Sequence, residues 1–250
     1  MINEGDIFKT KRYGDLVVTK YVNSQDVHVM FINTGYQTVT RASYIRQGLV
    51  KDRLSRSIYG VGITGDTELK VNGQYLKEYM LWKSVLRRCY SDYCHNTQPT
   101  YAECSMSKDF QYFPYFVEWC SKQKGFDSLD EKGRLFSLDK DILTKGNNVY
   151  SEDTCCFVPY EINNSFLKRG NKRGEYLIGV YKSKDRFTAQ LSKGKSIQIF
   201  LGSFSTEIEA FNVYKQAKEA HIKSLAEKWK DQIDPRVYEA LVKYEVEITD

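Results

Sequence analysis

The sequence has few histidines, no zinc-type cysteine spacing and no long apolar run. His28, His95 and His221 lie far apart, which argues against a histidine-rich metal centre. The six cysteines are scattered, without the short paired spacing of a zinc site. No stretch approaches the roughly 20 apolar residues that a membrane-spanning helix needs. The sequence therefore argues against zinc fingers and helical membrane proteins.

The N-terminal stretch "MINEGDIFKT" has no apolar core behind its charges, so it does not look like a signal peptide. We therefore expect a cytoplasmic protein whose cysteines are reduced and mostly buried. The content of 41% hydrophobic and 28% charged residues is typical of a folded chain. A length of 250 residues suits two or three small domains, and a net charge of +5 makes the distribution of charge more informative than its sum.

The first 65 residues alternate between apolar and polar side chains, with the period of two that β-strands show. The apolar positions are Leu16, Val18 and Tyr21, followed by Val27, Val29 and Phe31. About four or five short strands so close together predict a small SH3-like β barrel over residues 1–65. Such barrels bind nucleic acids or peptides, and an adaptor or structural role is an equally open interpretation.

From about residue 74 the apolar spacing becomes helical, and the segment 74–168 is interpreted as a central α+β domain. Aromatic residues recur every three to four positions in "QYLKEYMLWKSVLRRCYSDY" and again in "YFPYFVEWCSK". Aromatic side chains at this spacing are typical of a packed core, so we interpret them as packing residues rather than as a ligand platform.

The segment 174–230 predicts three strands followed by a helix. Strand-like runs at 177–182, 186–192 and 196–201 are separated by turn residues, and Thr206 with Glu209 forms a capping box at the start of the helix. The apolar helix positions Ile208, Phe211, Tyr214, Ala217 and Ala220 would cover one side of the sheet. The segment 231–250 is expected to form a C-terminal helix.

The uncovered side of this sheet would present cationic and amide side chains. Such side chains on a small sheet suit the major groove of DNA, where arginine, lysine and glutamine read base edges. The residues expected on this side are Tyr181, Lys182, Lys184, Arg186, Gln190, Lys193 and Lys195.

A basic linker precedes the sheet in "LKRGNKRGEY". One interpretation is a solvated linker, and the other is a basic strap along DNA phosphates. Its cationic residues are Lys168, Arg169, Lys172 and Arg173.

The segment 174–230 resembles the AP2 DNA-binding domain, a three-stranded sheet with one packing helix. The resemblance rests on about fifty residues, including Gly179-Val180, the run from Phe187 to Leu191, Leu201-Gly202-Ser-Phe204, and Thr206 with Glu209-Ala210 and Tyr214. Tyr181 and Ser192 stand where the plant members of the family usually have arginines.

The central segment, with "WKSVLRRCYSDYCHNTQPTY", "LDKDILTKGNNVYSEDTCCFVP" and "EINN", resembles phage and mobile-element HNH endonucleases that carry AP2 domains. The resemblance implies a ββα site around a divalent metal ion, Mg²⁺ or another, in a bacterial host cytoplasm. It places Asp139 at the first metal ligand, Lys140 at the general base, and Asn163 or Asn164 on the helix.

The general base of an HNH site is usually a histidine, and here it is replaced by lysine. A lysine is protonated at neutral pH and accepts the proton of water poorly. A charged Lys140 could still stabilise a phosphate, while Asp141 or a metal-bound hydroxide served as the base. In the alternative interpretation, "SLDKDI" is a strand with solvated charges, followed by a Gly146-Asn147-Asn148 turn.

We expect an α+β protein that binds double-stranded DNA. The resemblance implies metal-dependent DNA cleavage with an altered site. One alternative is a catalytically inactive DNA-binding regulator or a protein directed against host defence. Another is a protein-binding adaptor that contacts a host or phage protein through the N-terminal barrel.

Overall fold

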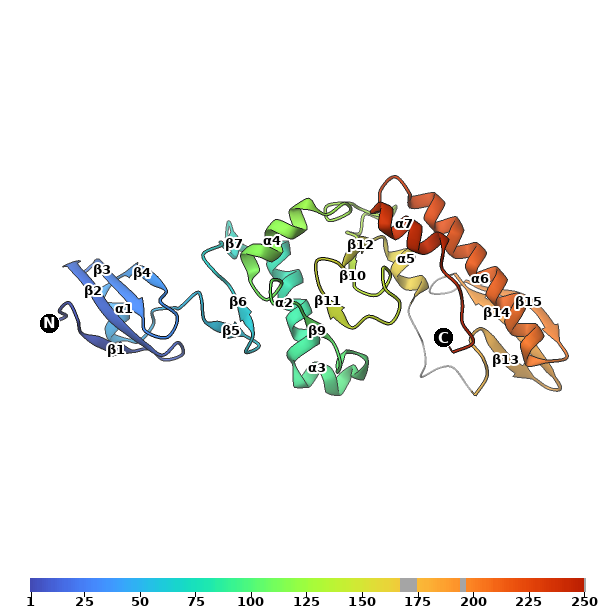
Figure 1. Cartoon of the computed structure of the whole chain (residues 1–250), viewed down its shortest axis with the longest axis horizontal. Coiled ribbons are helices and arrows are strands. Elements are labelled where there is room, and N and C mark those ends of the chain that lie inside the picture. The colour runs from blue at the N-terminus through green and yellow to red at the C-terminus, as the bar shows by residue number, and fades with distance from the viewer. Residues whose placement is uncertain (167–174, 194–196, 250) are drawn as a thin grey trace. The chain divides into compact units, whose positions relative to one another are not determined.

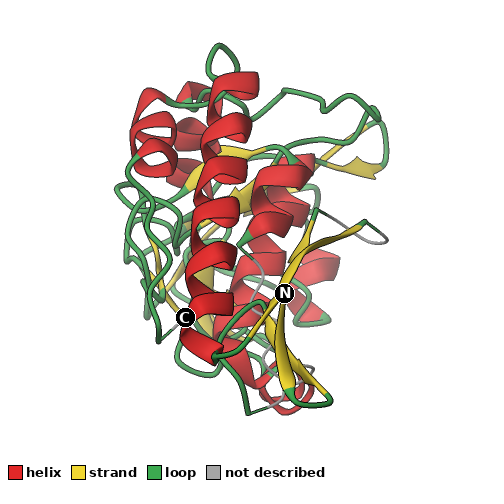
Figure 2. Cartoon of the chain, turned by 90° about the vertical axis from the view of Figure 1, so that its right-hand side faces the viewer, coloured by secondary structure: helices red, strands yellow, loops and turns green. Residues whose placement is uncertain are grey.

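A computed structural model describes residues 1–166, 175–193 and 197–249 of the chain (Figure 1). Helices and small sheets alternate along the sequence, so the fold class is mixed α+β, as predicted (Figure 2). In the described ranges, no helix is both long and apolar enough to cross a membrane. All six cysteines are buried, which confirms the expectation of buried cysteines.

The chain divides into two compact units. The first comprises Met1–Cys120 together with Val149–Ser151, and the second comprises Ser121–Asn148 together with Glu152–Asp250. The central segment that the sequence predicts as one domain, residues 74–168, therefore contributes residues to both units.

An open antiparallel sheet forms the N-terminal part of the first unit. Its strands are β1 (Ile7–Lys9), β2 (Asp15–Asn23), β3 (Asp26–Phe31) and β4 (Gln37–Thr40), and they pair in sequence order. The expectation of a barrel was wrong, because β1 and β4 remain the two edges of the sheet. Helix α1 (Ala42–Arg46) follows β4 and packs into the same core.

The predicted inward positions of this sheet are buried, except that Tyr21 is partly exposed. Leu16, Val18, Val29 and Phe31 are almost fully buried, whereas 36% of Tyr21 is exposed. The pairing of β2 with β3 shifts register between Val18 and Lys20. Tyr21 pairs with the buried Val27, so the β-bulge brings its side chain to the inner face, where it remains partly exposed.

The remainder of the first unit consists of short hairpins around an aromatic helical core. Trp82 is fully buried and donates its Nε1–H to the carbonyl oxygen of Phe110 over 2.7 Å. Its ring also packs against Phe113 with centroids 5.2 Å apart. These contacts confirm that the aromatic residues are packing residues. The elements are β5 (Arg56–Ile58), β6 (Gly62–Ile63), β7 (Lys70–Val71), β8 (Gln74–Tyr75), α2 (Lys77–Tyr90), α3 (Asp92–Thr97), the 3-10 helix η1 (Pro99–Tyr101), β9 (Ser105–Met106), α4 (Phe113–Lys122) and β11 (Val149–Tyr150).

The second unit begins with a strand pair and a short helix. Strand β10 (Ser137–Asp139) pairs antiparallel with β12 (Cys156–Val158), and α5 (Tyr160–Ser165) follows directly. Gly125 lies beside this pair with φ +92°, and a Cβ there would lie 3.1 Å from the carbonyl oxygen of Phe157. The close packing of the chain on β12 thus requires a glycine at this position.

Three strands and a long helix complete the second unit. Strands β13 (Val180–Ser183), β14 (Arg186–Ser192) and β15 (Gln198–Phe204) form one antiparallel sheet in this order. Helix α6 (Glu207–Trp229) starts with the predicted capping box between Thr206 and Glu209. The predicted order of three strands and a helix is therefore confirmed.

The C-terminal segment is less helical than the sequence analysis expects. Over residues 231–249, the described part of this segment, α7 (Pro235–Val242) is the only helix that begins there. Asp234 caps this helix and Pro235 occupies its first turn, a pairing that marks a helix start. The chain leaves the helical conformation after Lys243, and Val246 packs into the core under β14 and α6.

Candidate functional site

The sheet formed by β13, β14 and β15 has one covered face and one open face. Val180, Ala189 and Leu191 are buried and share a core with Phe211 and Tyr214 of α6. Because side chains alternate along a strand, the residues between these buried positions lie on the opposite face. We call this second side the outer face and define it by five residues: Tyr181, Arg186, Gln190, Phe200 and Ser203.

The outer face holds three of the predicted DNA-contacting residues, namely Tyr181, Arg186 and Gln190. Arg186 is exposed and lies across β15, where its Nη2 donates to the carbonyl oxygen of Ser203 over 2.7 Å and its Nε to Ser203 Oγ over 3.3 Å. A guanidinium carries five N–H donors. The two bonds therefore orient Arg186 and leave donors for a further partner.

Lys182 was wrongly assigned to this face. It pairs across the strands with Phe187, in the same alternation as Val180 and Ala189, and therefore lies on the covered side near its edge. Its Nζ lies 5.8 Å from the centre of the Phe187 ring. The long side chain of lysine covers an aromatic ring and keeps its charge exposed, which explains how a cation occupies a covered-face position.

The other predicted cations lie beside the sheet rather than on it. Lys184 occupies the β13–β14 turn with φ +54°, and Lys193 directly follows β14; both are exposed. Lys195 and the four cations of the basic linker lie outside the described residues. These four are Lys168, Arg169, Lys172 and Arg173.

Phe200 is a candidate contact residue that the sequence analysis did not identify. It pairs with Gln190 across the strands and 66% of its surface is exposed. Alternation alone would assign Phe200 to the same side as Gly202 and Phe204, which pair with covered-face residues, and the apolar run "IQIFLGSF" is typical of a core strand. The pairing of β14 with β15 shifts register between Ala189 and Gln190, which decides the faces of the residues beyond the shift.

In the segment 135–164, β10 and β12 pair and lead into α5, while β11 lies between them in sequence and pairs with β9 instead. Asp139 ends β10, and its Oδ1 accepts hydrogen bonds from the backbone N–H groups of Asp141 and Ile142, both over 2.9 Å. Burial, together with the charge of Asp141, raises the pKa of Asp139 from 3.8 to about 6. A carboxyl group with this pKa carries a proton more readily than an exposed one.

Lys140 closes the loop that follows β10. Its Nζ donates to the carbonyl oxygen of Asn147 over 2.9 Å and lies 3.3 Å from Oδ2 of Asp141. In return, Nδ2 of Asn147 donates to the carbonyl oxygen of Lys140 over 2.7 Å. An ammonium group that donates to these oxygens is positioned to hold the loop and not to accept a proton from water.

These residues fit a divalent metal ion only in part. Asp139 and Asp141 supply carboxylate oxygens of the kind that Mg²⁺ prefers, and Asn163 is half-buried on α5. However, the ammonium of Lys140 already lies beside Asp141. Within residues 1–166, 175–193 and 197–249, no three His, Cys, Asp or Glu residues gather as a metal site. The chain's own residues thus provide an incomplete shell.

His95 is structural in this chain. Its Nε2 lies 2.9 Å from the carbonyl oxygen of Arg88 on the preceding helix. This hydrogen bond joins α3 to α2.

Comparisons with protein-family models, with curated proteins and with solved structures find no match to this chain.

Proposed function

We propose that this protein binds double-stranded DNA through the outer face of the β13–β15 sheet. The observation that carries the proposal is the arrangement of Arg186, Gln190 and Phe200 on one uncovered face. Arginine and glutamine pair with the edges of guanine and adenine, and an apolar ring packs against the methyl group of thymine. A two- or three-stranded sheet fits the major groove.

The proposed contacts divide into two kinds. Arg186 and Gln190 would read base edges, while Lys184 and Lys193 at the strand ends would contact phosphates. The hydrogen bonds from Arg186 to Ser203 support this division, because they fix the direction of the guanidinium before any DNA binds. In this proposal the segment 174–230 is an AP2-like domain, and the protein acts in the cytoplasm of a phage-carrying bacterium.

The segment 135–164 acts in this proposal as a nuclease-like scaffold without cleavage. The support is the geometry of Lys140, which donates to Asn147 and Asp141 where an HNH nuclease has its base. A DNA-binding regulator or a protein directed against host defence would use the fold of this segment without needing it to cleave DNA.

Metal-dependent cleavage is the second candidate function. Asp139 favours it, because two backbone N–H groups hold its Oδ1 at the end of β10 and so fix the direction of the carboxyl group. Asp139 and Asn163 would hold the cation, and a bound Mg²⁺ would activate water and stabilise the charge on the phosphate.

Incubation of the purified protein with supercoiled plasmid and Mg²⁺ or Mn²⁺, followed by gel shift in the same tubes, separates the two candidates. We expect a shift without nicking for the wild type and for Asp139→Ala. Nicking that disappears in Asp139→Ala would instead establish the nuclease. The absence of a shift in every tube would refute DNA binding itself.

A further inference from the structure

A pocket of about 480 Å³ opens within the second unit. The turn before β10, helices α5 and α6, and the ends of β14 and β15 all contribute to its wall. The volume falls in the range of pockets that hold small ligands. The lining residues that matter here are Lys132, Arg134, Asn164, Lys193, Ile197 and Leu225.

Arg134 is fixed in the wall of this pocket before any ligand binds. Its Nε and Nη2 donate to Oδ2 of Asp130 over 2.7 and 2.6 Å, and its guanidinium lies 4.0 Å from the centre of the Tyr160 ring. This hydrogen bonding lowers the pKa of Asp130 to about 2, so the pair stays charged at neutral pH. Three of the five N–H donors of Arg134 remain without a partner among the described residues.

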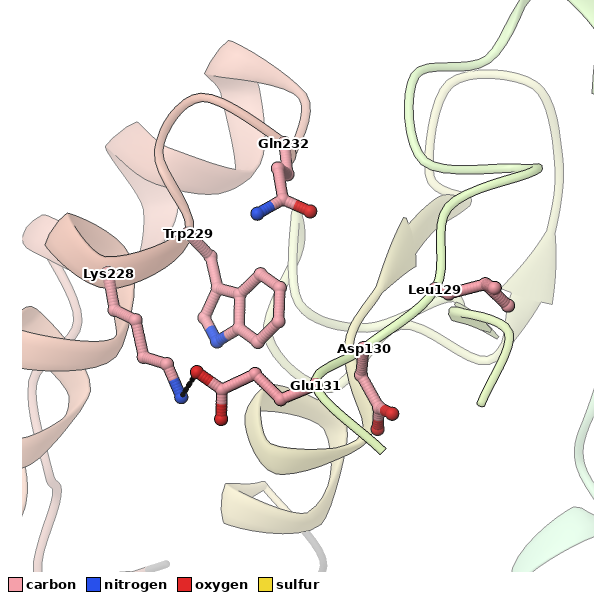
Figure 3. A pocket seen from close by; sticks show the side chains of 6 residues that line it. All are labelled: Leu129, Asp130, Glu131, Lys228, Trp229 and Gln232. Carbon is pink, nitrogen blue, oxygen red and sulfur yellow. Dashed lines mark ion pairs between the residues drawn. The ribbon is translucent and has the colours of Figure 1, made fainter. Parts of the chain in front are cut away.

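Among the described residues, Lys228 is shared between two glutamates near the pocket, whereas two of the pocket's lysines have no carboxylate partner. Lys228 lines the neighbouring pocket that Figure 3 draws, which shares Asp130, Glu131 and Trp229 with this one. Its Nζ lies 3.0 Å from Glu131 and 2.7 Å from Glu161, and the ion pair with Glu131 is marked in Figure 3. Lys132 and Lys193 form no ion pair with any described residue. The Arg134 side of the pocket therefore carries positive charge that suits an anion.

The rest of the wall is apolar, with hydrogen-bonding groups at its edge. Ile197 is 59% exposed and Leu225 is buried, so the two differ in depth. Asn164 accepts from the Tyr160 hydroxyl over 3.4 Å, which leaves its Nδ2 to donate. Burial, with Lys193 and Lys218 nearby, lowers the pKa of His221 in the same wall, so its ring is neutral at pH 7 and both donates and accepts.

We propose that this pocket binds one nucleoside monophosphate unit. The phosphate contacts the free donors of Arg134 together with Lys132 and Lys193, and the base packs on Ile197 and Leu225. Asn164 donates to the edge of the base. A bare anion would leave the apolar wall without a partner, and a neutral aromatic ligand would leave Lys132 and Lys193 without one.

Two ligands would present this nucleoside monophosphate to the pocket. One is a free nucleotide, and the other is an unpaired nucleotide within a DNA strand. A protein that takes an unpaired nucleotide into a pocket binds a strand most tightly where the base is already unpaired. Binding of the free nucleotide does not depend on the outer face, so this inference can hold or fail separately from the proposed function.

Calorimetric titration of the full chain with thymidine and adenosine 5′-monophosphates, thymidine and inorganic phosphate tests the proposal. We expect millimolar or tighter binding of a monophosphate, and binding at least about tenfold weaker for the nucleoside and for phosphate. Equal binding of phosphate alone would overturn the nucleotide assignment, and so would a lack of binding by every probe.

Two pocket variants and one control complete this test. Arg134→Lys keeps the charge but loses the stacked, two-donor geometry, and we expect monophosphate binding at least about tenfold weaker. Ile197→Glu places a carboxylate at the exposed rim and should weaken binding similarly without disturbing the core. Ile248→Glu adds the same charge at an exposed residue outside the pocket wall and should have no effect. Equal binding by both pocket variants and the wild type would overturn the proposal.

Competition distinguishes the two sources. The competition uses Arg186→Ala, a variant of the outer face, with the monophosphate already bound. A duplex with one unpaired nucleotide should displace the monophosphate at a concentration at least about tenfold lower than the fully paired duplex needs. That result supports a strand nucleotide, whereas monophosphate binding without such competition supports a free nucleotide. Failure of both the monophosphates and the unpaired strand to bind would overturn the pocket assignment even if the paired duplex binds the wild type.

Discussion

The ring of Tyr214 on α6 lies directly against Gly179 at the start of the β13–β15 sheet. A Cβ on Gly179 would lie 2.0 Å from Cδ2 of Tyr214, and the backbone there has φ +77°. A residue other than glycine would meet both a steric clash and an unfavourable backbone conformation. The contact therefore determines how closely the helix packs on the sheet.

Gly179→Ala should lower the free energy of unfolding by at least about 3 kcal/mol, because the Cβ must displace Tyr214 or the strand. Urea denaturation measures this change. Gly146→Ala is the matched control, since Gly146 has φ +80° but open space around its Cβ. Its cost should stay near about 1 kcal/mol. Equal effects of the two substitutions would show that the contact with Tyr214 does not matter.

Phe200→Ser should weaken DNA binding without weakening the fold. Because Phe200 is 66% exposed, we expect a change in unfolding free energy within about 0.5 kcal/mol. Loss of an apolar contact to a base should weaken duplex binding about fivefold or more. Ile208→Ser on α6 is the control, since Ile208 is 50% exposed and lies off the outer face. Unchanged DNA affinity in Phe200→Ser would remove this residue from the interface.

Asp139→Asn should stabilise the protein at neutral pH. The pKa of Asp139 rises from 3.8 to about 6 on folding, through burial and the charge of Asp141. A raised pKa means that the folded state favours the protonated carboxyl, so its stability contribution is full below pH 3.8 and is lost as the pH rises through 6. At pH 7.5 we expect a gain of about 1 to 3 kcal/mol in Asp139→Asn. Denaturation at pH 7.5 and pH 4 checks this, and a gain that does not shrink at pH 4 would contradict it.

Lys218→Met should also stabilise the chain near pH 7. Burial lowers the pKa of Lys218 from 10.5 to about 8, and its Nζ donates to the carbonyl oxygen of Ser165 over 2.6 Å. The depressed pKa penalises folding below pH 8, and the penalty disappears as the pH rises through 10.5. After loss of the hydrogen bond, a net gain of about 1 kcal/mol is expected at pH 7. A stability loss at pH 7 would show that the hydrogen bond outweighs the buried charge.

Local sequence signals predicted the strands and helix of the second unit well. The turn at Lys184-Asp185 and the capping box of Thr206 with Glu209 each depend on residues that are close together in sequence. The sequence alone therefore locates them. The helix face was predicted less well. Phe211 and Tyr214 are buried as expected, but Ile208 and Ala220 are exposed because the sheet covers only part of the helix.

Features that depend on strand pairing escaped the sequence analysis. A barrel closes only if β1 and β4 pair through hydrogen bonds, and no local sequence pattern predicts that pairing. The faces of Lys182 and Phe200 follow from register and from the shift after Ala189. The sequence identified Lys140 as unusual, but its bond to the carbonyl oxygen of Asn147 connects positions that only the folded loop brings together.

The most direct test of the central claim is fluorescence anisotropy of a labelled DNA duplex, titrated with the protein over a series of salt concentrations. We expect binding that weakens steeply as salt rises, and at least about a hundredfold loss in the triple variant Arg186→Ala, Gln190→Ala and Phe200→Ser. Circular dichroism should show that this variant remains folded. Duplex binding of the same strength in the triple variant and the wild type would contradict the claim, and so would no binding at low salt.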